Sequence, residues 1–419
     1  MSLDQQEPPQ AGATVIKRSG TTAGERLEKA RDNLPTRSKT SATSKVKEGP
    51  LCERYPIKDK GEIRLVKLVK TSGILCFRMK VVRLDDEPAY KAASYEWGPK
   101  DQQGGYKIMI QGQPNYVRKN LMEFLLKLRD HDPNVFSYWM FIDQLCIDQG
   151  IYDERSFQAS QMGRVYSQAE EVMAWVGPST PDDEEAIKAM QSGEEAYLLR
   201  GSKAGSLFEK PYWNRVWIVQ EVLLAKKLVI LCGARRIELD TLLQFIERSK
   251  VKWNVPSLLK KRSEGIKSFD LRTAISKFVR YECQLPQDKV YGLTGLIEPS
   301  QRIEVDYTKN KMEVLTDLLN ALLKVHYETT SGKPFVDYKR SYTLFDGYSP
   351  EALAYDGGVD PIIMAAYFIG GFELKYMAWR INEMVKQKEG SRALFTVEEV
   401  NSLNAKPTSS WKRLSYLLK

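Results

Sequence analysis

The sequence PYWNRVWIVQEVLLAKKLVILCG, residues 211–233, changes from a helical pattern to a strand-like pattern without a polar break. Its first part places large side chains at helical spacing, namely Trp213, Val216, Trp217, Gln220 and Leu224. Leu228–Cys232 is a short apolar run that ends at Gly233, which is typical of a buried strand. The stretch therefore predicts a helix followed directly by a strand, one unit of an α/β fold.

Glu221 follows Trp217 by one helical turn, so its carboxylate and the indole share one face of the predicted helix. Taken alone, this spacing favours a core tryptophan and a solvated acid over a functional pair. The choice between the two interpretations depends on the motifs in the rest of the chain.

The segments before this stretch alternate between strand-like and helical patterns. Strands are predicted at 63–68, 74–83, 90–98, 106–110, 115–117, 138–142 and 172–176. Amphipathic helices are predicted at 120–129, 154–171 and 181–200, the last with Thr180 as its cap. This order predicts a parallel sheet with helices on both faces and extra strands on its N-terminal side.

Ligands of such sheets bind at the carboxyl ends of the strands. In this chain the predicted ends are residues 94–98 and 143–149, Gly177 and Gly233. We expect the helix that carries Glu221 to face the same crevice.

The remaining segments differ in character from this α/β part. Helices are predicted at 239–247, at 268–281, from a cap at Asp288, at 312–326 and at 361–386. Residues 1–50 are poor in large apolar side chains and predict a disordered basic tail. We expect residues 51–235 to form the α/β domain and 236–330 a helical extension packed on it, and we assign no role to 331–419.

Composition indicates a globular protein, with 42% hydrophobic and 28% charged residues. No apolar stretch follows Met1, and no apolar run reaches the roughly 20 residues of a membrane span. We therefore expect a soluble, cytoplasmic protein with no signal peptide and no membrane span. The five cysteines are widely spaced and odd in number, which predicts reduced thiols.

The formal net charge of +9 is unevenly distributed. Residues 250–280 contain nine Lys or Arg and two acids, a local net charge of +7. Such a cluster can bind nucleic acid or another anionic partner. A solvated helical face is favoured, because neither an aromatic strand motif nor zinc-finger spacing accompanies the charges.

Several kinds of chemistry lack their sequence signals. The two histidines, His131 and His326, lie in a turn and on a predicted helix, where incidental roles are favoured. The sequence has no zinc or calcium motif, no Walker loop and no Gly-x-Gly-x-x-Gly after a strand. We therefore expect neither a metal nor a resident cofactor, and the remaining candidates are carboxylates among aromatic side chains.

Five motifs in order give the chain a family resemblance. They are YKAASYEWG at 90–98, FIDQLCIDQ at 141–149, Glu154-Arg155 with Gln158, Met162, Tyr166 and Ala169, AWVG at 174–177, and RVWIVQE at 215–221. Together they resemble the fungal heterokaryon incompatibility (HET) domain, and DKVYGLTGL at 288–296 and VDY at 305–307 resemble segments that follow it. The departures are Ala93 where the family usually has Leu and Asp148 where it usually has Asn.

This resemblance implies a role in nonself recognition and programmed cell death when incompatible fungal cells fuse. It also implies self-association of the active protein and an incompatibility partner protein. A non-catalytic module that signals by self-assembly, in which the motifs serve fold and interface, remains an alternative.

A more distant similarity connects the chain to Toll/interleukin receptor (TIR) domains. The order of elements, Phe-Ile-Asp on the second strand and Trp-x-x-x-Glu before the fourth are similar to that family. A glutamate in the corresponding segment of plant TIR domains is needed to cleave NAD, and Glu221 is the position here that matches. The similarity implies a flavodoxin-like sheet and NAD as a substrate rather than a cofactor.

The residue inventory suits that chemistry. Cleavage of the nicotinamide–ribose bond passes through an oxocarbenium-like state that one carboxylate can stabilise. Nicotinamide leaves a cationic pyridinium as a neutral molecule, so no general acid is required. Glu221 is the catalytic candidate, and Trp97 or Trp217 could stack on a flat ring.

The other candidates have structural alternatives. Ser94, Tyr95 and Gly98 could shape a nucleotide pocket, although Tyr95 and Trp97 could equally belong to the core. Asp143 could bind ligand or could accept backbone N–H groups of the following loop.

Two further candidates for the site have weaker support in the sequence. Arg155 could bind a phosphate, although an ion pair with Asp143 or Asp153 is favoured. Gln149 is a candidate through the motif resemblance alone.

Overall fold

The computed structural model describes residues 51–100, 104–192, 205–248 and 256–329. In these residues nine strands form one sheet. The strands are β1 (Glu62–Val69), β2 (Cys76–Arg83), β3 (Lys91–Tyr95), β4 (Tyr106–Ile110), β5 (Gln113–Val117), β6 (Met140–Phe141), β7 (Glu171–Gly177), β8 (Leu228–Cys232) and β9 (Arg235–Glu238). The predicted segments 1–50 and 331–419, including the helix at 361–386, lie outside the described residues.

The sheet has a parallel centre and antiparallel edges. Its spatial order is β5-β4-β2-β1-β6-β3-β7-β8-β9, and β6, β3, β7 and β8 run parallel to their neighbours within this group. Along the chain these four strands follow the spatial order 2-1-3-4, which is the order of flavodoxin-like sheets. The predicted α/β fold with a parallel sheet and extra N-terminal strands is thus confirmed, and the narrower likeness to TIR domains stays a prediction.

The edges of the sheet are mixed. β1 runs antiparallel to both β6 and β2, and β9 runs antiparallel to β8. β4 pairs with β2 in parallel and forms the predicted hairpin with β5. Parallel pairing therefore dominates the central four strands and recurs once at the edge, between β2 and β4.

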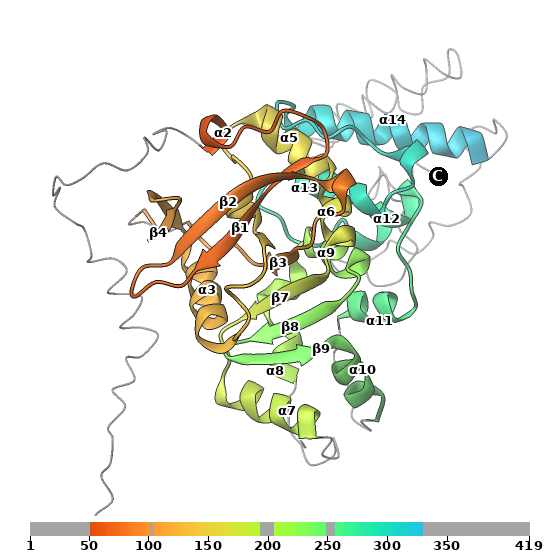
Figure 1. The fold of residues 1–419 in the computed structure, drawn as a ribbon. Helices are drawn as coiled ribbons and strands as arrows, with labels where there is room; N and C mark the ends of the chain where they lie inside the picture. Colours follow the sequence, from red (N-terminus) through yellow and green to blue (C-terminus); the bar gives the residue numbers. More distant parts are fainter. Residues whose placement is uncertain (1–50, 101–103, 193–204, 249–255, 330–419) are drawn as a thin grey trace, which may run out of the picture.

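Helices surround the sheet, and Figure 1 shows α5, α13 and α14 at one end of the molecule and α7 and α10 at the other. The α-helices are α2 (Leu51–Arg54), α3 (Lys119–His131), α4 (Asp143–Cys146), α5 (Tyr152–Ser160), α6 (Met162–Gln168), α7 (Pro181–Ser192), α8 (Gly205–Phe208), α9 (Ile218–Leu224), α10 (Leu239–Arg248), α11 (Ser257–Ser263), α12 (Leu271–Phe278), α13 (Asp288–Tyr291) and α14 (Lys311–Thr329). The 3-10 turns are η1 (Leu84–Asp86), η3 (Pro211–Asn214), η4 (Thr294–Leu296) and η5 (Pro299–Gln301).

The two faces of the central strands carry different helices. Successive side chains of a strand point to opposite faces, and Ser94 and Tyr95 illustrate this at the end of β3. The Tyr95 ring lies 6.3 Å from the ring of Phe124 on α3. The Ser94 hydroxyl instead bonds to Glu221 on α9. Helices α3 and α9 therefore cover opposite faces, and residues after β3 lie between them.

The predicted helix between Trp213 and Leu224 is interrupted. A 3-10 turn, η3, comes first, and α9 begins only at Ile218. Between them Arg215 is extended (φ −81°, ψ 137°) and forms a parallel bridge with Glu282. Pairing of this backbone with a distant segment replaces the helical hydrogen bonds that spacing alone predicts.

Three other predicted elements differ from the structure. The helix at 154–171 is divided into α5 and α6, and at the break the amides of Gln158 and Gln161 donate to the Glu62 carbonyl. The strand at 138–142 is reduced to β6, because α4 starts at Asp143. Asp288 does not cap a helix: the N-cap of the short α13 is Gln287.

The other helices match their predicted places within a few residues. Thr180 and Asp183 form a reciprocal capping pair at the start of α7, with N–H to side-chain oxygen distances of 2.8 and 3.1 Å. Of the predicted helix at 181–200, the part after Ser192 lies largely outside the described residues.

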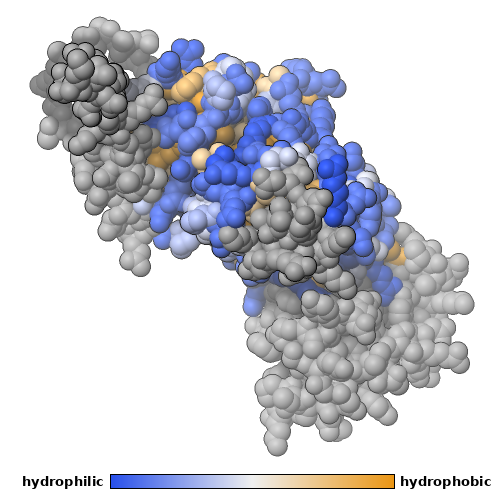
Figure 2. Space-filling model, turned by 90° about the horizontal axis from the view of Figure 1, so that it is seen from below, coloured by the Kyte–Doolittle hydropathy of each residue, from blue (hydrophilic) through white to orange (hydrophobic). Residues whose placement is uncertain are grey.

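One face of the described residues is mainly polar. On the face in Figure 2, hydrophilic side chains dominate and hydrophobic ones occur in small patches. None of the helices in the described part of the chain has the length and apolar character that crossing a membrane requires. Cys76, Cys146, Cys232 and Cys283 are free thiols.

Candidate active site

A cavity of about 550 Å³ opens at the carboxyl ends of β3 and β6, a size suited to small-molecule binding. One wall follows β3 and β6 and includes Trp97, Gly98, Asp143 and Gln149. The opposite wall comes from residues 282–285, Asp288 and Tyr307. Two of the four predicted strand ends thus line this pocket. Gly233 instead lines a second cavity, of about 280 Å³, and Gly177 lines neither.

Glu221 is a buried carboxylate of the pocket, with 4% of its surface exposed. Its Oε2 accepts the Ser94 hydroxyl at 2.5 Å, and the Ser94 oxygen lies 2.7 Å from the Tyr212 hydroxyl. Burial raises the pKa of Glu221 to about 7, although Arg215 and the Ser94 hydrogen bond favour the ionised form. The interpretation of Glu221 as a solvated acid, which helical spacing alone favoured, is therefore wrong.

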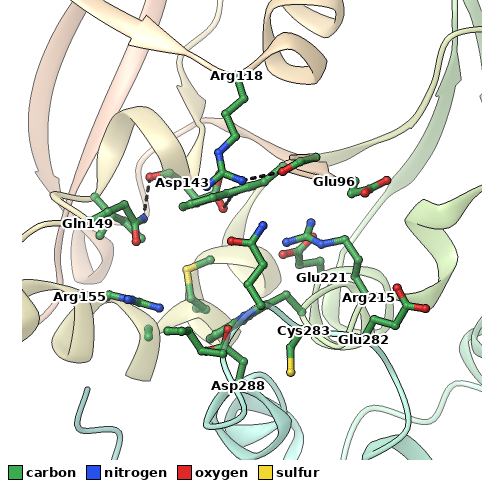
Figure 3. Close-up of a pocket in the computed structure, with 18 of the residues that line it drawn as sticks. Glu96, Arg118, Asp143, Gln149, Arg155, Arg215, Glu221, Glu282, Cys283 and Asp288 are labelled. Atoms are coloured by element: carbon green, nitrogen blue, oxygen red, sulfur yellow. Dashed lines mark hydrogen bonds between the residues drawn. The ribbon is translucent and has the colours of Figure 1, made fainter. Parts of the chain in front are cut away.

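Arg215 provides the positive charge next to Glu221, as Figure 3 shows. Its guanidinium donates a hydrogen bond to the Tyr95 carbonyl at the end of β3. The extended backbone at Arg215 directs the side chain to this strand end while α9 presents Glu221. The interruption of the helix is thus what brings the two charges together.

Asp143 holds the wall that follows the strands. Its Oδ1 accepts the Tyr95 hydroxyl at 2.8 Å and the Gln144 N–H at 2.7 Å, and its Oδ2 accepts the Trp97 indole N–H at 2.7 Å. Burial raises the pKa of Asp143, while these hydrogen bonds and Arg215 lower it. Asp143 thus accepts a backbone N–H, as one of the two alternatives predicted, and it also borders the cavity, while ligand binding by Asp143 stays a prediction.

Two arginines lie over aromatic rings of the pocket. The guanidinium carbon of Arg118 is 4.8 Å from the Trp97 ring centroid, and Nη1 donates to the Gly98 carbonyl at 2.7 Å. The guanidinium carbon of Arg155 is 3.8 Å from the Tyr307 ring centroid. The favoured ion pair of Arg155 with Asp143 or Asp153 does not occur among the described residues, because the guanidinium stacks on this ring.

The remaining candidates occupy different positions relative to the cavity. Ser94 and Tyr95 lie behind the lining and contact it through Glu221 and Asp143. Gln149 lines the cavity and its amide lies 3.5 Å from the Asp143 carbonyl oxygen. Gly98 lines it with φ +68°, a left-handed conformation that favours glycine.

The two departures from the family pattern lie outside the lining. Ala93 is buried in β3, and its carbonyl accepts the Tyr166 hydroxyl at 2.9 Å. The Asp148 carboxylate accepts the Gly150 N–H at 3.2 Å.

The sequence motifs missed several lining residues. Arg215, Asp288 and Tyr307 stand inside quoted motifs but were not singled out for chemistry. Arg118 has no motif around it that could have indicated its position. The lining residues not predicted for the site are Glu96, Pro99, Lys100, Arg118, Ile147, Ala159, Met162, Arg215, Glu282, Cys283, Gln284, Leu285, Asp288 and Tyr307.

Metal ligands do not gather in the part of the chain that the structure describes. No group of three or more His, Cys, Asp or Glu side chains there is arranged to hold a metal ion. His131 lies at the second cavity, beside Lys127 and Asn134.

Comparison with known proteins connects part of the chain, including one wall of this pocket, with a family. Residues 90–221 match the family described as Heterokaryon incompatibility protein (HET). The chain contains a HET domain. The match begins just before β3 and ends at Glu221, so it includes the wall that follows the strands, Arg155 and the start of α9.

A relative agrees with the assignment of the HET domain. The chain is similar to "Heterokaryon incompatibility protein 6, OR allele" of Neurospora crassa, with 30% identity over 139 residues. The similar region is 31% of this chain and 20% of that relative, so the chain spans about a fifth of the length of the curated relative. No solved structure matches the chain.

The HET match divides the pocket. Trp97, Asp143 and Glu221 lie within residues 90–221, whereas Asp288 and Tyr307 follow the match. The cavity of this HET domain is therefore closed by a segment that the family description does not cover.

Proposed function

We propose that the pocket of this HET domain binds NAD and cleaves its nicotinamide–ribose bond, with Glu221 as the catalytic carboxylate. The observation that supports the proposal is a buried, hydrogen-bonded Glu221 at a cavity of small-molecule size. Arg215 beside it favours the ionised form that the reaction needs.

In the proposed reaction the bond between ribose C1′ and the pyridinium nitrogen breaks, and its electron pair leaves with nicotinamide. The positive charge that develops on the ribose is stabilised by the Glu221 carboxylate, whose orientation is fixed by Ser94. Water then adds to C1′ and releases a proton, which gives ADP-ribose. Fixed dipoles and charges of this kind need no reorganisation during the reaction.

The walls of the cavity offer matching contacts for the rest of NAD. The Trp97 indole donates a hydrogen bond to Asp143, and Arg118 lies over its ring. The indole is therefore held in one orientation, and a flat ring of NAD can pack against it. Arg155 and Arg215 line the same cavity and can approach a diphosphate. Pairs of guanidinium groups are well suited to phosphate oxygens.

The cellular role follows from the family relationship as part of this proposal. Consumption of NAD would serve nonself recognition and programmed cell death, and the Neurospora crassa relative is named as a heterokaryon incompatibility protein. The active form would be a homo-oligomer, and an incompatibility partner protein would trigger it.

A non-catalytic module that signals by self-assembly is the second candidate. It requires no charged cavity, whereas the described cavity contains four cationic and five acidic side chains. These charges border a cavity of small-molecule size, which favours the enzymatic role.

Nucleic-acid binding through residues 250–280 is less favoured. Arg262 of this cluster serves the fold, since it donates to the Val222 carbonyl at the end of α9 at 2.7 Å. Burial and neighbouring Lys277 lower the pKa of Lys261, so part of the charge is packed and self-repelling. Binding to DNA or RNA that weakens steeply with salt would restore this role.

Nicotinamide release from NAD tests the proposal. We expect a rate of nicotinamide release per protein molecule that increases with protein concentration. We expect the Glu221→Gln protein to fold but to release nicotinamide at least about 100-fold more slowly. The exposed Glu247→Gln protein is the matched control. Full turnover by folded Glu221→Gln protein would remove Glu221 from the mechanism.

A further inference from the structure

The wall that follows the HET match is held directly against the helix of Glu221. The Val216 N–H donates to the Glu282 carbonyl at 2.9 Å, and the Glu282 N–H donates to the Asn214 carbonyl at 2.5 Å. These backbone bonds fix residue 282 beside the extended residue that precedes α9. The register of this wall relative to Glu221 is therefore set by main-chain pairing rather than by side chains alone.

A second contact packs the same wall without space for a side chain. A Cβ atom on Gly295 would lie 2.7 Å from Gly163 Cα on α6 and 2.4 Å from Gln220 Oε1 on α9. Only glycine permits this approach. The turn η4 is thus packed against both helices, and the wall cannot shift without disturbing α9.

Asp288 is the buried acid of this wall. Only 5% of its surface is exposed, and its Oδ1 accepts the Tyr307 hydroxyl at 2.7 Å. Burial raises the pKa of Asp288, while Tyr307, Arg155 and donation from the Trp217 side chain lower it. One carboxylate therefore interacts with two aromatic residues that line the pocket.

Tyr307 in turn is fixed from three sides. Its N–H donates to the Ser156 hydroxyl at 2.8 Å, and its ring meets the Tyr291 ring edge-on with centroids 5.2 Å apart. The Arg155 guanidinium lies over its face at 3.8 Å. The location of the Arg155 charge in the pocket therefore depends on Tyr307, whose hydroxyl depends on Asp288.

We infer that Asp288 is a positioning residue, which fixes Tyr307 and, through the ring of Tyr307, the Arg155 guanidinium as a subsite for a phosphate of the nucleotide. This inference rests on the proposed function and deepens it, because it assigns nucleotide binding to a wall outside the HET match. Asp288 itself touches no reacting atom; its effect passes through the residues that it holds.

The experiment compares Asp288→Asn with wild type and with Glu298→Gln, an exposed acid of the same segment. Kinetics of nicotinamide release give kcat and KM, and calorimetric titration with NAD gives Kd. We expect Asp288→Asn to raise KM and Kd about tenfold with kcat within about threefold, since the hydrogen bond that holds the Tyr307 hydroxyl is weakened. We expect Glu298→Gln to match wild type.

A second variant covers the case in which Asp288→Asn fails to fold. Tyr307→Phe removes only the hydroxyl that Asp288 accepts, and we expect KM and Kd to rise about threefold or more. Unchanged Kd and KM in a folded Asp288→Asn or Tyr307→Phe protein would overturn the inference.

A separate measurement tests the role of Asp288 if the proposed function is wrong. If wild type releases no nicotinamide, the role of Asp288 is tested by the near-ultraviolet circular dichroism of Tyr307, measured as wild type minus Tyr307→Phe. Loss of this difference signal in the Asp288→Asn background supports the positioning role. Its persistence overturns that role, whether or not NAD is cleaved.

Discussion

The two walls of the pocket come from distant parts of the chain, yet each is built around an aspartate, half-buried in the case of Asp143 and buried in the case of Asp288. Asp143, after β6, accepts the Tyr95 hydroxyl and the Trp97 indole N–H. Asp288, at the start of α13, accepts the Tyr307 hydroxyl. In both walls the carboxylate faces donors of the protein, so its main effect is to hold aromatic side chains in place.

Glu221 differs from both aspartates in a way that matters for chemistry. Its hydrogen-bond partner at 2.5 Å is the small hydroxyl of Ser94, and burial raises the pKa of Glu221 to about 7. The comparison teaches that burial of an acid in this pocket is not by itself a catalytic sign. Glu221 accepts its hydrogen bond from a small hydroxyl and lies beside Arg215 in the cavity, whereas the two aspartates hold aromatic side chains.

The pocket wall that follows β3 and β6 and contains Asp143 is called the first wall here, and the wall that contains Asp288 and Tyr307 the second. The largest expected effect concerns the contacts that support the first wall. Arg64 of β1 is fully buried and binds Glu154, whose Oε1 also accepts the Asp148 N–H at 2.7 Å in the loop after Asp143. Glu154→Ala leaves the Arg64 charge buried and unpaired, so we expect a loss of about 3–5 kcal/mol of unfolding free energy. Urea denaturation measures this loss, with the exposed neighbour Asp153→Ala as control.

A loss below about 1 kcal/mol in Glu154→Ala would contradict this account of the first wall. It would mean that the loop between β6 and α5 is held by other contacts.

The second wall is tested by its glycine contact. In Gly295→Ala the new Cβ would meet backbone of Gly163 at 2.7 Å, so we expect a loss of about 1–3 kcal/mol. Gly205→Ala is the control, because nothing lies within 4 Å of a Cβ at that position. Equal thermal stability of the two variants would show that the second wall is not packed against α6 as described.

The pH dependence of turnover tests whether the ionisation of Glu221 controls the reaction. Because the reaction needs the ionised Glu221 and burial raises its pKa to about 7, kcat/KM should rise with pH and level off above about 7. A single ionisation of this pKa makes the value at pH 6 about tenfold lower than the plateau. A profile that is flat from pH 5 to 9 would exclude Glu221 as the titrating group.

Much of the fold could be predicted from hydrophobic periodicity. The strands of the parallel centre and helices such as α3 and α7 lie close to their predicted places, since each is a long pattern with clear ends. The extended backbone at Arg215 could not be predicted, because its partner, Glu282, is distant in sequence. Periodicity describes local preference and contains no information on such pairing.

The site was predictable in part. Motif resemblance placed Trp97, Asp143 and Glu221 near one another, and the structure brings all three to one cavity. The stacking of Arg155 on the Tyr307 ring could not be predicted. An arginine with acids close to it in the sequence is usually expected to form an ion pair. The ring that Arg155 covers, Tyr307, comes from the second wall.

The most direct test of the account is nicotinamide release from NAD by wild type and Glu221→Gln protein, with NAD binding measured on the same samples. The account predicts that Glu221→Gln binds NAD within about threefold of wild type but turns it over at least about 100-fold more slowly. Equal turnover by the two folded proteins would contradict it.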